Sequence, residues 1–480
     1  MYQAATQIIN GQEVRPNGTP LLDVINPATE EVLSSVSTAG PAEVAAALEA
    51  ARQGMAEWRA KSAWERSTIL RRVGVLMRER ADAIGRLLTY EIGKPLAEGR
   101  GETMGSADYF EWCADEARRI YDVTLPGRSA TSRFEIHHEP IGIVLALTAW
   151  NFPINLSARK IAMALAAGCS LILRPAEEGP ASVAALIRCC HDAGVPVGAV
   201  NLLVGSPDAI VKPLMAEKDV RMVSFTGSTR VGKLLIQQSA ETVKRLSLEL
   251  GGHAPFLVLE DADIDTAVTV ALGAKFRNAG QVCTSASRFF VHQSHVRAFT
   301  EGLVEGARKI KLGNGFEDGV QMGPLATNRQ RERAERLVAD ARQKGASILT
   351  GGQRPQAMNR GYFFEPTVMT DVPENADILT QEPFTPIAAI VPFTNTDEII
   401  QRANSLEAAL AAYVVSRSGG ASDAISARLQ AGAIAVNTAA VATPEAPFGG
   451  LKESGYGKEG GPEGVRDFLI QRYVHRVAAQ

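Results

Sequence analysis

The sequence predicts an α/β protein in which helices wind around mostly parallel sheets. From about residue 141 onward, short apolar runs alternate with stretches of helical spacing. Apolar runs separated by helices are typical of parallel strands that are buried on both faces. The chain has 480 residues, 45% of them hydrophobic and 21% charged, so it can bury a large core. At about 150 residues per domain, this length indicates two large units or three smaller ones.

The first predicted unit begins with a helical region, because residues 41–84 carry apolar side chains at helical spacing. Strands and helices then alternate. The strands are predicted at residues 141–147, 171–173, 200–204, 222–225 and 246–250, and the helices begin at residues 156, 181, 208 and 231. This order is typical of a Rossmann-like, nucleotide-binding domain.

A second α/β unit is predicted to begin just after Gly251 and Gly252. Its helices are predicted at residues 264–276, 296–309 and 329–344, and its strands at 289–291, 387–392 and 411–415. The polar, alternating segment 127–139 predicts a projecting hairpin, and residues 468–477 predict a strand that pairs elsewhere.

Charge and cysteine content disfavour several classes of protein. With 50 Lys and Arg against 53 Asp and Glu, the net charge is −3, which gives no general attraction to nucleic acid or anionic membranes. Five cysteines without a CxxC or Cys/His spacing predict neither a disulfide framework nor a metal site. The apolar run at 141–149 has about nine residues against the ~20 of a membrane span, and no signal peptide is recognisable. We therefore expect a soluble, cytoplasmic protein without a metal.

Cys283 is the cysteine best placed to act as a nucleophile. It lies in FRNAGQVCTSAS, where small and polar neighbours exclude a core strand. A free cysteine is more often a buried apolar residue, and Cys189 and Cys190, in a predicted amphipathic helix, are interpreted in that way. A reactive thiolate also needs partners.

Two polar residues at the ends of predicted strands are candidate partners. Glu249 ends the apolar run in SLELGG, where partial burial raises the pKa of a carboxyl and suits it to act as a base. An ordinary solvated carboxylate is the alternative. Asn151 in TAWNFP follows a parallel strand, where α/β folds bind ligands, and its amide can donate to an oxyanion. The alternative is a turn residue before Pro153.

The evidence for a phosphate site is weaker, because no GxGxxG follows a strand. SFTGSTRVGK places Gly227 and Ser228 between a strand and a helix, where N–H groups and a hydroxyl bind a pyrophosphate. The same residues also suit a plain helix cap.

Seven motifs occur in one order along the chain, namely TAWNFP, LRPAEE, FTGSTRVG, LELGGHAP, GQVC, QEPFTP and PFGGLKESGYG. Over essentially its whole length the chain resembles the NAD(P)-dependent aldehyde dehydrogenase superfamily, and within it the succinate-semialdehyde dehydrogenase group. The resemblance implies the aldehyde dehydrogenase fold and a homodimer or homotetramer. The implied division is a Rossmann-like cofactor domain (1–120 and 141–251), an α/β catalytic domain (252–460) and a small β oligomerisation element (121–140 and 461–480).

The resemblance also implies roles for individual residues. Cys283 corresponds to the nucleophile, Glu249 to the base and Asn151 to the oxyanion donor, while Lys160 and Glu459 correspond to a pair that relays protons from the base. The implied cofactor contacts are Trp150, Arg174, Glu177, Gly227, Ser228, Leu250, Glu382 and Phe384.

The implied reaction converts an aldehyde, NAD⁺ and water into a carboxylate and NADH through a thiohemiacetal and a thioester on Cys283. The presence of Glu249 favours water over coenzyme A as the acyl acceptor. NAD⁺ is expected because Glu177 corresponds to a carboxylate on the adenosine ribose, and a carboxylate repels a 2′-phosphate. Arg174, where the family usually has Lys, suits phosphate and leaves NADP⁺ use open.

The expected substrate is succinate semialdehyde. Arg159 and Arg277 resemble the two arginines that bind the substrate carboxylate in succinate-semialdehyde dehydrogenases, and Thr443 and Phe448 are further expected substrate contacts. Either arginine is alternatively a surface residue or part of an ion pair. The hydroxyl expected before PFGG falls on Ala442, which leaves glutarate semialdehyde and 2-oxoglutarate semialdehyde as alternatives.

Two other classes of protein remain as alternatives. A cofactor-free cysteine hydrolase needs a histidine near the thiol, and of the seven histidines only His253 lies near a predicted site motif, without a triad pattern. A non-catalytic scaffold is disfavoured by the intact set of Cys283, Glu249 and Asn151.

Overall fold

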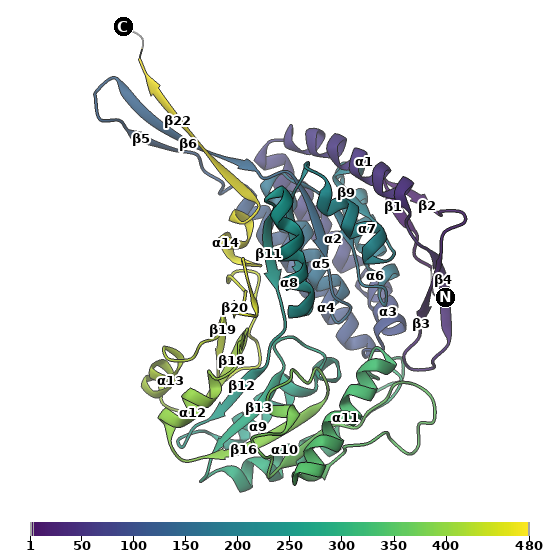
Figure 1. Ribbon diagram of the computed structural model, residues 1–480, viewed down its shortest axis with the longest axis vertical. Coiled ribbons are helices and arrows are strands. Elements are labelled where there is room, and N and C mark those ends of the chain that lie inside the picture. Colours follow the sequence, from purple (N-terminus) through teal and green to yellow (C-terminus); the bar gives the residue numbers. More distant parts are fainter. Residues whose placement is uncertain (1, 3, 479–480) are drawn as a thin grey trace.

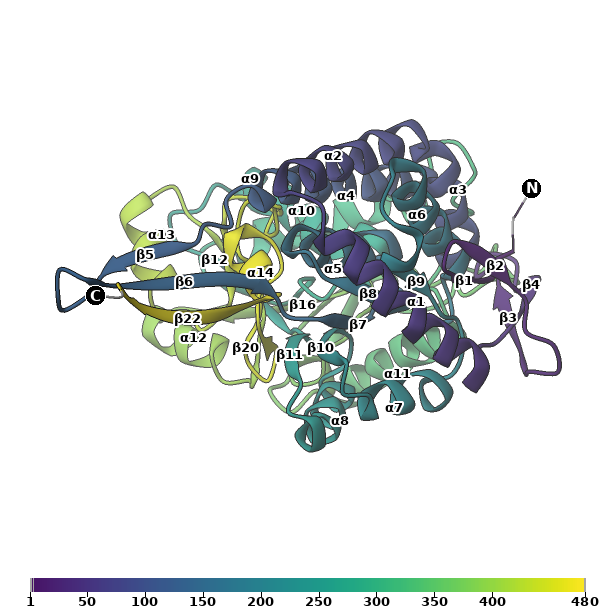
Figure 2. The same cartoon turned by 90° about the horizontal axis from the view of Figure 1, so that it is seen from above.

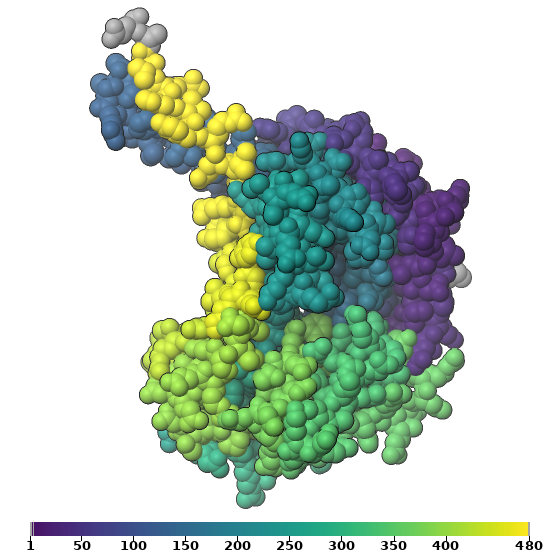
Figure 3. Space-filling model, in the orientation of Figure 1, coloured from purple at the N-terminus to yellow at the C-terminus, as the bar shows by residue number. Residues whose placement is uncertain are grey.

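Two sheets with helices on their faces form the body of the molecule, and a third sheet projects from it (Figure 1). The structure is a computed structural model that describes residue 2 and residues 4–478. In the space-filling view the green part of the chain forms a lobe below the purple and teal part, and the yellow C-terminal segment runs up beside the teal part (Figure 3). The projecting sheet leaves the body at the upper left.

The first sheet has eight strands in the order β2-β1-β9-β8-β7-β10-β11-β21. Its five central strands, from β9 to β11, are parallel, as the alternating pattern predicts. The strands are β1 (Gln7–Ile9), β2 (Gln12–Val14), β7 (Ile143–Leu147), β8 (Ser170–Arg174), β9 (Val200–Leu202), β10 (Val220–Thr226), β11 (Arg245–Glu249) and β21 (Gly455–Tyr456).

Helices cover both faces of this sheet because alternate residues of each strand point to opposite sides. In β7, Val144 and Ala146 pack in the core shared with α2–α6, whereas Ile143, Leu145 and Leu147 pack in the core shared with α1 and α7. The helices are α1 (Pro41–Arg59), α2 (Ala63–Glu79), α3 (Ala81–Ile92), α4 (Leu96–Ala117), α5 (Pro153–Ala167), α6 (Pro180–Ala193), α7 (Pro207–Ala216) and α8 (Thr229–Ser239). The helical region predicted at 41–84 is thus three helices.

The second sheet has seven strands in the order β14-β15-β16-β13-β12-β18-β19. Its strands are β12 (Ala254–Val258), β13 (Ala286–His292), β14 (Ser347–Thr350), β15 (Thr367–Thr370), β16 (Ile387–Phe393), β18 (Ala411–Val415) and β19 (Ala433–Val436). Its helices are α9 (Ile264–Phe276), α10 (Val296–Lys309), α11 (Asn328–Lys344), α12 (Thr396–Ala403) and α13 (Gly419–Ser426). β12 was not predicted, although the apolar run APFLV is a signal for it.

The projecting sheet confirms the predicted hairpin and its partner strand. β5 (Val123–Pro126) pairs with β6 (Ser132–Pro140), and β22 (Leu469–Val477) pairs antiparallel with the whole of β6 (Figure 2). The remaining short elements are β3 (Leu21–Ile25), β4 (Val32–Ser37), β17 (Ala408–Ala409), β20 (Leu451–Lys452), α14 (Gly461–Arg466) and the 3₁₀ turns η1 (Val197–Ala199), η2 (Ala240–Thr242), η3 (Arg277–Gly280) and η4 (Asp377–Leu379).

The end of the chain returns to the first unit. β21 pairs with β11, and α14 packs against α4 and α5. The segment around Glu459 therefore lies beside the carboxyl end of β11. The division into domains at residues 251 and 460 stays a prediction. Within the described residues, each helix is either too short or too polar to cross a membrane.

Candidate active site

A cleft of about 1380 Å³ is lined by residues of both units. In the first unit, the residues that follow β7 and β8 and the carboxyl ends of β10 and β11 form its wall, as expected for a parallel sheet. The Cys283 loop and residues from α11, Glu382 and Phe384 line it from the second unit. Every residue predicted for the site lines this cleft except Lys160, which is buried behind it.

The loop that carries Cys283 has an unusual backbone. Asn278, Ala279 and Gly280 have φ values of 49°, 53° and 72°, so three successive residues are left-handed. A Cβ at Gly280 would lie 2.2 Å from the carbonyl oxygen of Thr385, which explains glycine there. Such a conformation at Ala279 is costly and is typical of functional sites.

Buried hydrogen bonds hold this loop in place. The Gln281 side chain donates to the carbonyl of Asn278 (3.0 Å) and accepts from the N–H of Ala326 (2.9 Å). Tyr413 of β18 donates its hydroxyl to the carbonyl of Thr284, the residue after Cys283, at 2.8 Å. The position of the nucleophile therefore depends on packing from the second sheet.

The Cys283 thiol is surrounded by groups with opposing effects. Burial raises the pKa of the thiol to about 12; Arg159 acts to lower it, while Glu249, Glu382 and Glu459 raise it further. Gly252 lies directly behind the nucleophile, because a Cβ there would be 2.2 Å from the Cys283 carbonyl oxygen. Burial and the neighbouring carboxylates thus favour the thiol over the thiolate.

Glu249 is the last residue of β11 and is almost fully buried, at 3% exposure. Neither carboxyl oxygen has a hydrogen-bond partner among the described residues. Burial raises the pKa of Glu249 well above its ordinary value, and the charge of Glu459 adds to this effect, whereas Lys160 and Arg159 oppose it. A Cβ at Gly449 would lie 2.9 Å from Oε1, so the PFGG motif leaves the room that this carboxyl occupies. The prediction of a desolvated carboxyl is confirmed, and the solvated alternative is wrong.

Lys160 and Glu459, the predicted relay pair, are in contact. Lys160 Nζ donates to Glu459 Oε1 at 2.5 Å and to the hydroxyl of Ser224 at 3.2 Å. Both side chains are buried. The other carboxyl oxygen of Glu459 lies 3.6 Å from the guanidinium of Arg159. One carboxylate therefore balances two cations next to Glu249.

Asn151 is buried in the turn between β7 and α5. Its side-chain Nδ2 donates to the carbonyl of Gln281 at 3.0 Å, two residues before the nucleophile. Its backbone carbonyl accepts from Lys94 and Asn278. Asn151 is therefore a turn residue before Pro153, which was the alternative to a donor role. Its side-chain amide also reaches the Cys283 loop.

The residues predicted to bind the cofactor form a continuous wall. Trp150 and Phe384 meet edge to face with their ring centroids 5.5 Å apart. Glu382 accepts from the N–H of Gly252 at 3.0 Å, and burial raises the pKa of its carboxyl to about 7. Leu250 follows Glu249, and a Cβ at Gly232 would collide with its side chain, so α8 packs closely on the end of β11.

The phosphate and ribose residues lie at the other end of this wall. Ser228 lines the cleft and also caps α8 by accepting from the N–H of Val231 at 3.4 Å, as the helix-cap alternative predicts. A Cβ at Gly227 would lie 2.3 Å from the ring of Phe225. Arg174 donates to Glu177 at 2.8 Å, so the two residues predicted on the ribose also bind each other.

Four arginines that line the cleft were not predicted from the sequence, namely Arg230 and three residues of α11. Arg329, Arg333 and Arg336 lie on one face of α11 at helical spacing and line the cleft. Arg333 also donates to the carbonyls of Glu382 and Pro383. These arginines and the N-terminus of α8 line the same cleft, and both suit an anionic dinucleotide. The signal in the sequence was the i, i+4, i+7 spacing of the three arginines.

The two arginines predicted to bind the substrate differ in their surroundings. Arg159 is buried between the rings of Tyr109 and Phe448, with ring centroids 4.8 and 5.1 Å from its guanidinium carbon. Its Nε has no hydrogen-bond partner among residues 2 and 4–478. Arg277 is exposed in the cleft over the ring of Phe152. The ion-pair alternative thus applies to Arg159, through Glu459. Thr443 also lines the cleft.

The histidine required by a cysteine hydrolase does not line the cleft. His253 is buried with its Nε2 3.1 Å from the carbonyl oxygen of Ile378, and burial lowers the pKa of its imidazole to about 3. Like His253, the other six histidines lie outside the lining of the cleft in the described part of the chain. Within residues 2 and 4–478, no group of His, Cys, Asp and Glu is arranged to hold a metal ion.

Comparison with known proteins agrees with this geometry. The family model described as "Aldehyde dehydrogenase family" matches residues 14–474. The chain is 42% identical to a succinate-semialdehyde dehydrogenase [NADP(+)] of Escherichia coli (97% of this chain, 96% of that protein) and 44% identical to a 3-sulfolactaldehyde dehydrogenase of Pseudomonas putida (97% and 96%). It is 41% identical to a glutarate-semialdehyde dehydrogenase of Pseudomonas putida KT2440 (97% and 96%).

Solved structures show the same fold. A succinate-semialdehyde dehydrogenase from Burkholderia pseudomallei superposes with a TM-score of 0.96 at 42% identity, covering 99% of this chain and 98% of that chain. A betaine aldehyde dehydrogenase from Staphylococcus aureus, solved with NAD⁺, superposes with a TM-score of 0.94 at 33% identity, covering 98% and 94%.

The fold and the cleft thus define a cysteine-dependent oxidoreductase that binds a dinucleotide, and the chain belongs to the aldehyde dehydrogenase family. It is an NAD(P)-dependent enzyme that oxidises aldehydes. The predicted fold, family, reaction and NAD(P) dependence are confirmed, and the hydrolase and scaffold alternatives are set aside.

The raised pKa of Cys283 has a direct chemical consequence. Because burial disfavours the thiolate, its fraction should rise about tenfold per pH unit while the pH stays below the pKa. We expect the rate of Cys283 alkylation by iodoacetamide, without cofactor, to rise steadily between pH 7 and 10. Mass spectrometry of the Cys283 peptide measures this rate, and C283A gives the background from the other four cysteines. A rate that levels off below about pH 9 would contradict the burial effect.

Proposed function

We propose that this enzyme oxidises an aldehyde with an anionic group at its far end, and that succinate semialdehyde is its substrate. The observation that carries the proposal is the pair Arg159 and Arg277 in the cleft that also contains Cys283. Charge-assisted contacts from two guanidinium groups suit a carboxylate, which would otherwise be desolvated without compensation. The names of the succinate- and glutarate-semialdehyde dehydrogenase relatives support a terminal carboxylate.

The length of the substrate and the type of anion are the points on which candidates differ. Glutarate semialdehyde and 2-oxoglutarate semialdehyde carry the same terminal carboxylate. The 44% identical relative is named for 3-sulfolactaldehyde, whose terminal group is a sulfonate. Ala442 lacks the hydroxyl expected beside the anion, and the neighbouring Thr443 supplies one. We favour the carboxylate because two planar guanidinium groups match its two oxygens.

In the first half-reaction, we assign nucleophilic attack on the aldehyde carbon to Cys283, which attacks as the thiolate after its proton has passed to solvent. The new C–S bond turns the carbonyl oxygen of the aldehyde into an oxyanion. Asn151 Nδ2 has two hydrogens and donates one to Gln281, so the second is free for the oxyanion of the thiohemiacetal. The backbone N–H of Cys283 is the second donor. Donors already in place stabilise this charge more than mobile water does, because they need no reorganisation.

In the second half-reaction, Glu249 takes a proton from the water that cleaves the thioester on Cys283. The Lys160–Glu459 pair behind it exchanges that proton. Trp150, Leu250, Glu382 and Phe384 would hold the nicotinamide end of the cofactor, with Arg174, Glu177, Gly227 and Ser228 at the adenosine and phosphate end. The bound nicotinamide supplies the hydride acceptor.

We also propose a cytoplasmic homodimer or homotetramer. The projecting sheet supports this assembly, because Val123, Leu125, Tyr473 and Val477 are exposed on it, and an open sheet edge invites pairing. The cysteine content supports a reducing compartment. The oligomerisation element would then comprise residues 121–140 and 461–480. The cofactor domain would comprise residues 1–120 and 141–251, and the catalytic domain residues 252–460.

Variants of Cys283 and Glu249 should separate the two half-reactions. C283A should form no NADH. E249Q should release a burst of about one NADH per site and then stall as the thioester, because the burst precedes proton transfer to the base. Stopped-flow absorbance measures the burst, and mass spectrometry detects the acyl group on Cys283. Turnover of E249Q at the wild-type rate would show that Glu249 is not the base.

Replacing Arg277 should change substrate preference. The loss of one charge-assisted contact, about 1.5–3 kcal/mol, should lower kcat/KM of R277L for succinate semialdehyde by about 10- to 100-fold. Activity on butanal, which carries no charge, should stay the same or rise. Equal loss on both aldehydes would mean that Arg277 supports the Cys283 loop instead of the substrate. Glutarate semialdehyde and 3-sulfolactaldehyde, assayed in parallel, distinguish the alternatives.

Glu177 should set the choice of cofactor. The wild-type enzyme is expected to have a higher kcat/KM with NAD⁺ than with NADP⁺, because a carboxylate repels the 2′-phosphate. E177Q should narrow this difference by improving NADP⁺ use, since Arg174 then lacks its carboxylate partner. Steady-state kinetics with both cofactors measures the ratio, and equal values for the wild-type enzyme would rule the preference out.

A further inference from the structure

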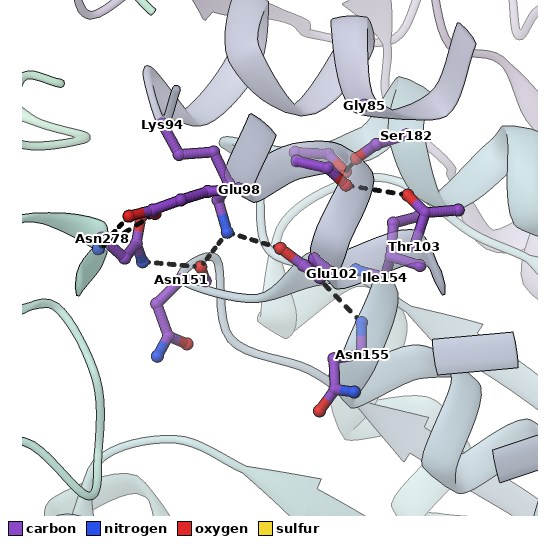
Figure 4. A network of polar contacts seen from close by, with 12 residues as sticks. Gly85, Lys94, Glu98, Glu102, Thr103, Asn151, Ile154, Asn155, Ser182 and Asn278 are labelled. Atoms are coloured by element: carbon purple, nitrogen blue, oxygen red, sulfur yellow. Dashed lines mark hydrogen bonds and ion pairs between the residues drawn. The ribbon is translucent and has the colours of Figure 1, made fainter. Parts of the chain in front are cut away.

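A buried lysine that does not line the cleft holds the turn that carries Asn151 (Figure 4). Lys94 lies between α3 and α4, and its side chain has no exposed surface. Its Nζ donates to Glu102 Oε2 at 2.5 Å and to the backbone carbonyl of Asn151 at 3.0 Å. The same ammonium lies 4.1 Å from the centre of the Phe152 ring. Lys94 therefore contacts two successive residues of this turn.

Glu102 continues the network into the helix that follows the turn. Its Oε1 accepts from the N–H groups of Ile154 and Asn155 at 2.9 and 3.1 Å. These are N–H groups of the first turn of α5, whose N-cap, Phe152, makes no capping hydrogen bond through its side chain. A carboxylate at this end also interacts favourably with the helix dipole. The Lys94–Glu102 pair thus holds the turn and the start of α5 together.

The same carbonyl also connects to the loop of the nucleophile. Asn278, one of the left-handed residues before Cys283, donates its Nδ2 to the Asn151 carbonyl at 2.9 Å. The N–H of Asn278 is held by Glu98 Oε2 at 3.0 Å. Glu98 and Glu102 are four residues apart on α4 and so lie on one face of that helix. Figure 4 shows the two carboxylates on either side of Lys94.

A buried ion pair adds little net stability compared with an apolar pair of the same size, because both charges lose their hydration. Its clearest physical effect here is directional: it fixes the carbonyl of Asn151 from one side while Asn278 fixes it from the other. A fixed carbonyl restricts the peptide and the Cα–Cβ direction of Asn151. The side-chain amide is thereby held toward the Cys283 loop.

We propose that Lys94, held by Glu102, is a positioning residue for the oxyanion donor of Asn151. The inference rests on the proposed role of Asn151. Without the ammonium, the turn would lose one of its two anchors, and the amide would lose its alignment with the aldehyde bound to Cys283. The effect should fall on the first half-reaction and leave cofactor binding unchanged. Misplacement of a catalytic group by about 1 Å can cost about 100-fold in rate.

The experiment compares E102Q with K94M/E102Q. The glutamine in E102Q keeps an oxygen for the N–H groups of α5, and the double variant removes the lysine without leaving a buried carboxylate unpaired. With NAD⁺ and succinate semialdehyde at saturation, the burst of NADH should be at least about tenfold slower in the double variant. The dissociation constant of NAD⁺ should stay within about twofold in both. K94Q/E102Q, which fills the space with a neutral amide, serves if K94M/E102Q does not fold.

A matched control and a second background make the result specific. K244M removes another buried lysine that donates to backbone carbonyls, those of Glu217 and Val220, far from Cys283 along β11. It should leave the burst unchanged. In an N151A background, the further step from E102Q to K94M/E102Q should change the burst by less than about threefold, because the group being positioned is absent.

Three results would overturn the inference. An unchanged burst in K94M/E102Q, together with a slow burst in N151A, would refute the positioning role and leave the proposed function standing. A loss of the same size with and without Asn151 would show that Lys94 acts on the fold in general. A wild-type burst in N151A would refute the donor role itself, and with it both the assignment of Asn151 and the inference drawn from it.

Discussion

The site depends on the close approach of backbone segments around Cys283, which only glycine permits. Gly252 passes behind the nucleophile, Gly280 touches the segment that carries Phe384, and Gly449 faces Glu249. At each position a Cβ would lie 2.9 Å or less from an oxygen atom. These contacts bring the end of β11, the Cys283 loop and the PFGG segment within reach of one substrate. A side chain at any of the three would separate the thiol, the base or the cofactor wall from the others.

The charged side chains around Cys283 offset one another, and this explains the raised pKa of Glu249. Glu459 is matched by Lys160 and Arg159 at once, so neither cation is fully available to Glu249. Glu249 is buried without a hydrogen-bond partner of its own among the described residues, and its pKa is raised accordingly. Moving a proton among these carboxyls therefore changes the basicity of Glu249 directly. That coupling connects the proposed relay pair, Lys160 and Glu459, to the proposed base.

The spacing of apolar residues along the chain predicted the helices and strands better than it predicted contacts between residues far apart in the sequence. The helices at 264–276 and 296–309 and the strand at 411–415 have the predicted bounds, because apolar spacing and turn residues are local properties. The strand ends also placed Glu249 and Asn151 at the edge of the sheet that lines the cleft. The contact of Lys94 with Asn151 spans 57 positions and that of Lys160 with Glu459 spans 299. Such pairs follow from topology, which no local spacing encodes, and Glu459 was found only through resemblance.

The two arginines proposed to bind the substrate carboxylate lie in different surroundings, which suit them to different roles. Arg159 already has Glu459 at 3.6 Å and two aromatic rings against its guanidinium, so much of its charge is compensated before substrate enters. Arg277 makes no ion pair with a carboxylate in the described part of the chain and lies exposed over Phe152. A buried guanidinium with one partner orients an anion through its remaining N–H groups, whereas an unpaired one supplies net attraction. We therefore propose that Arg277 provides most of the electrostatic selection for a charged aldehyde, and that Arg159 fixes the distance from that charge to Cys283.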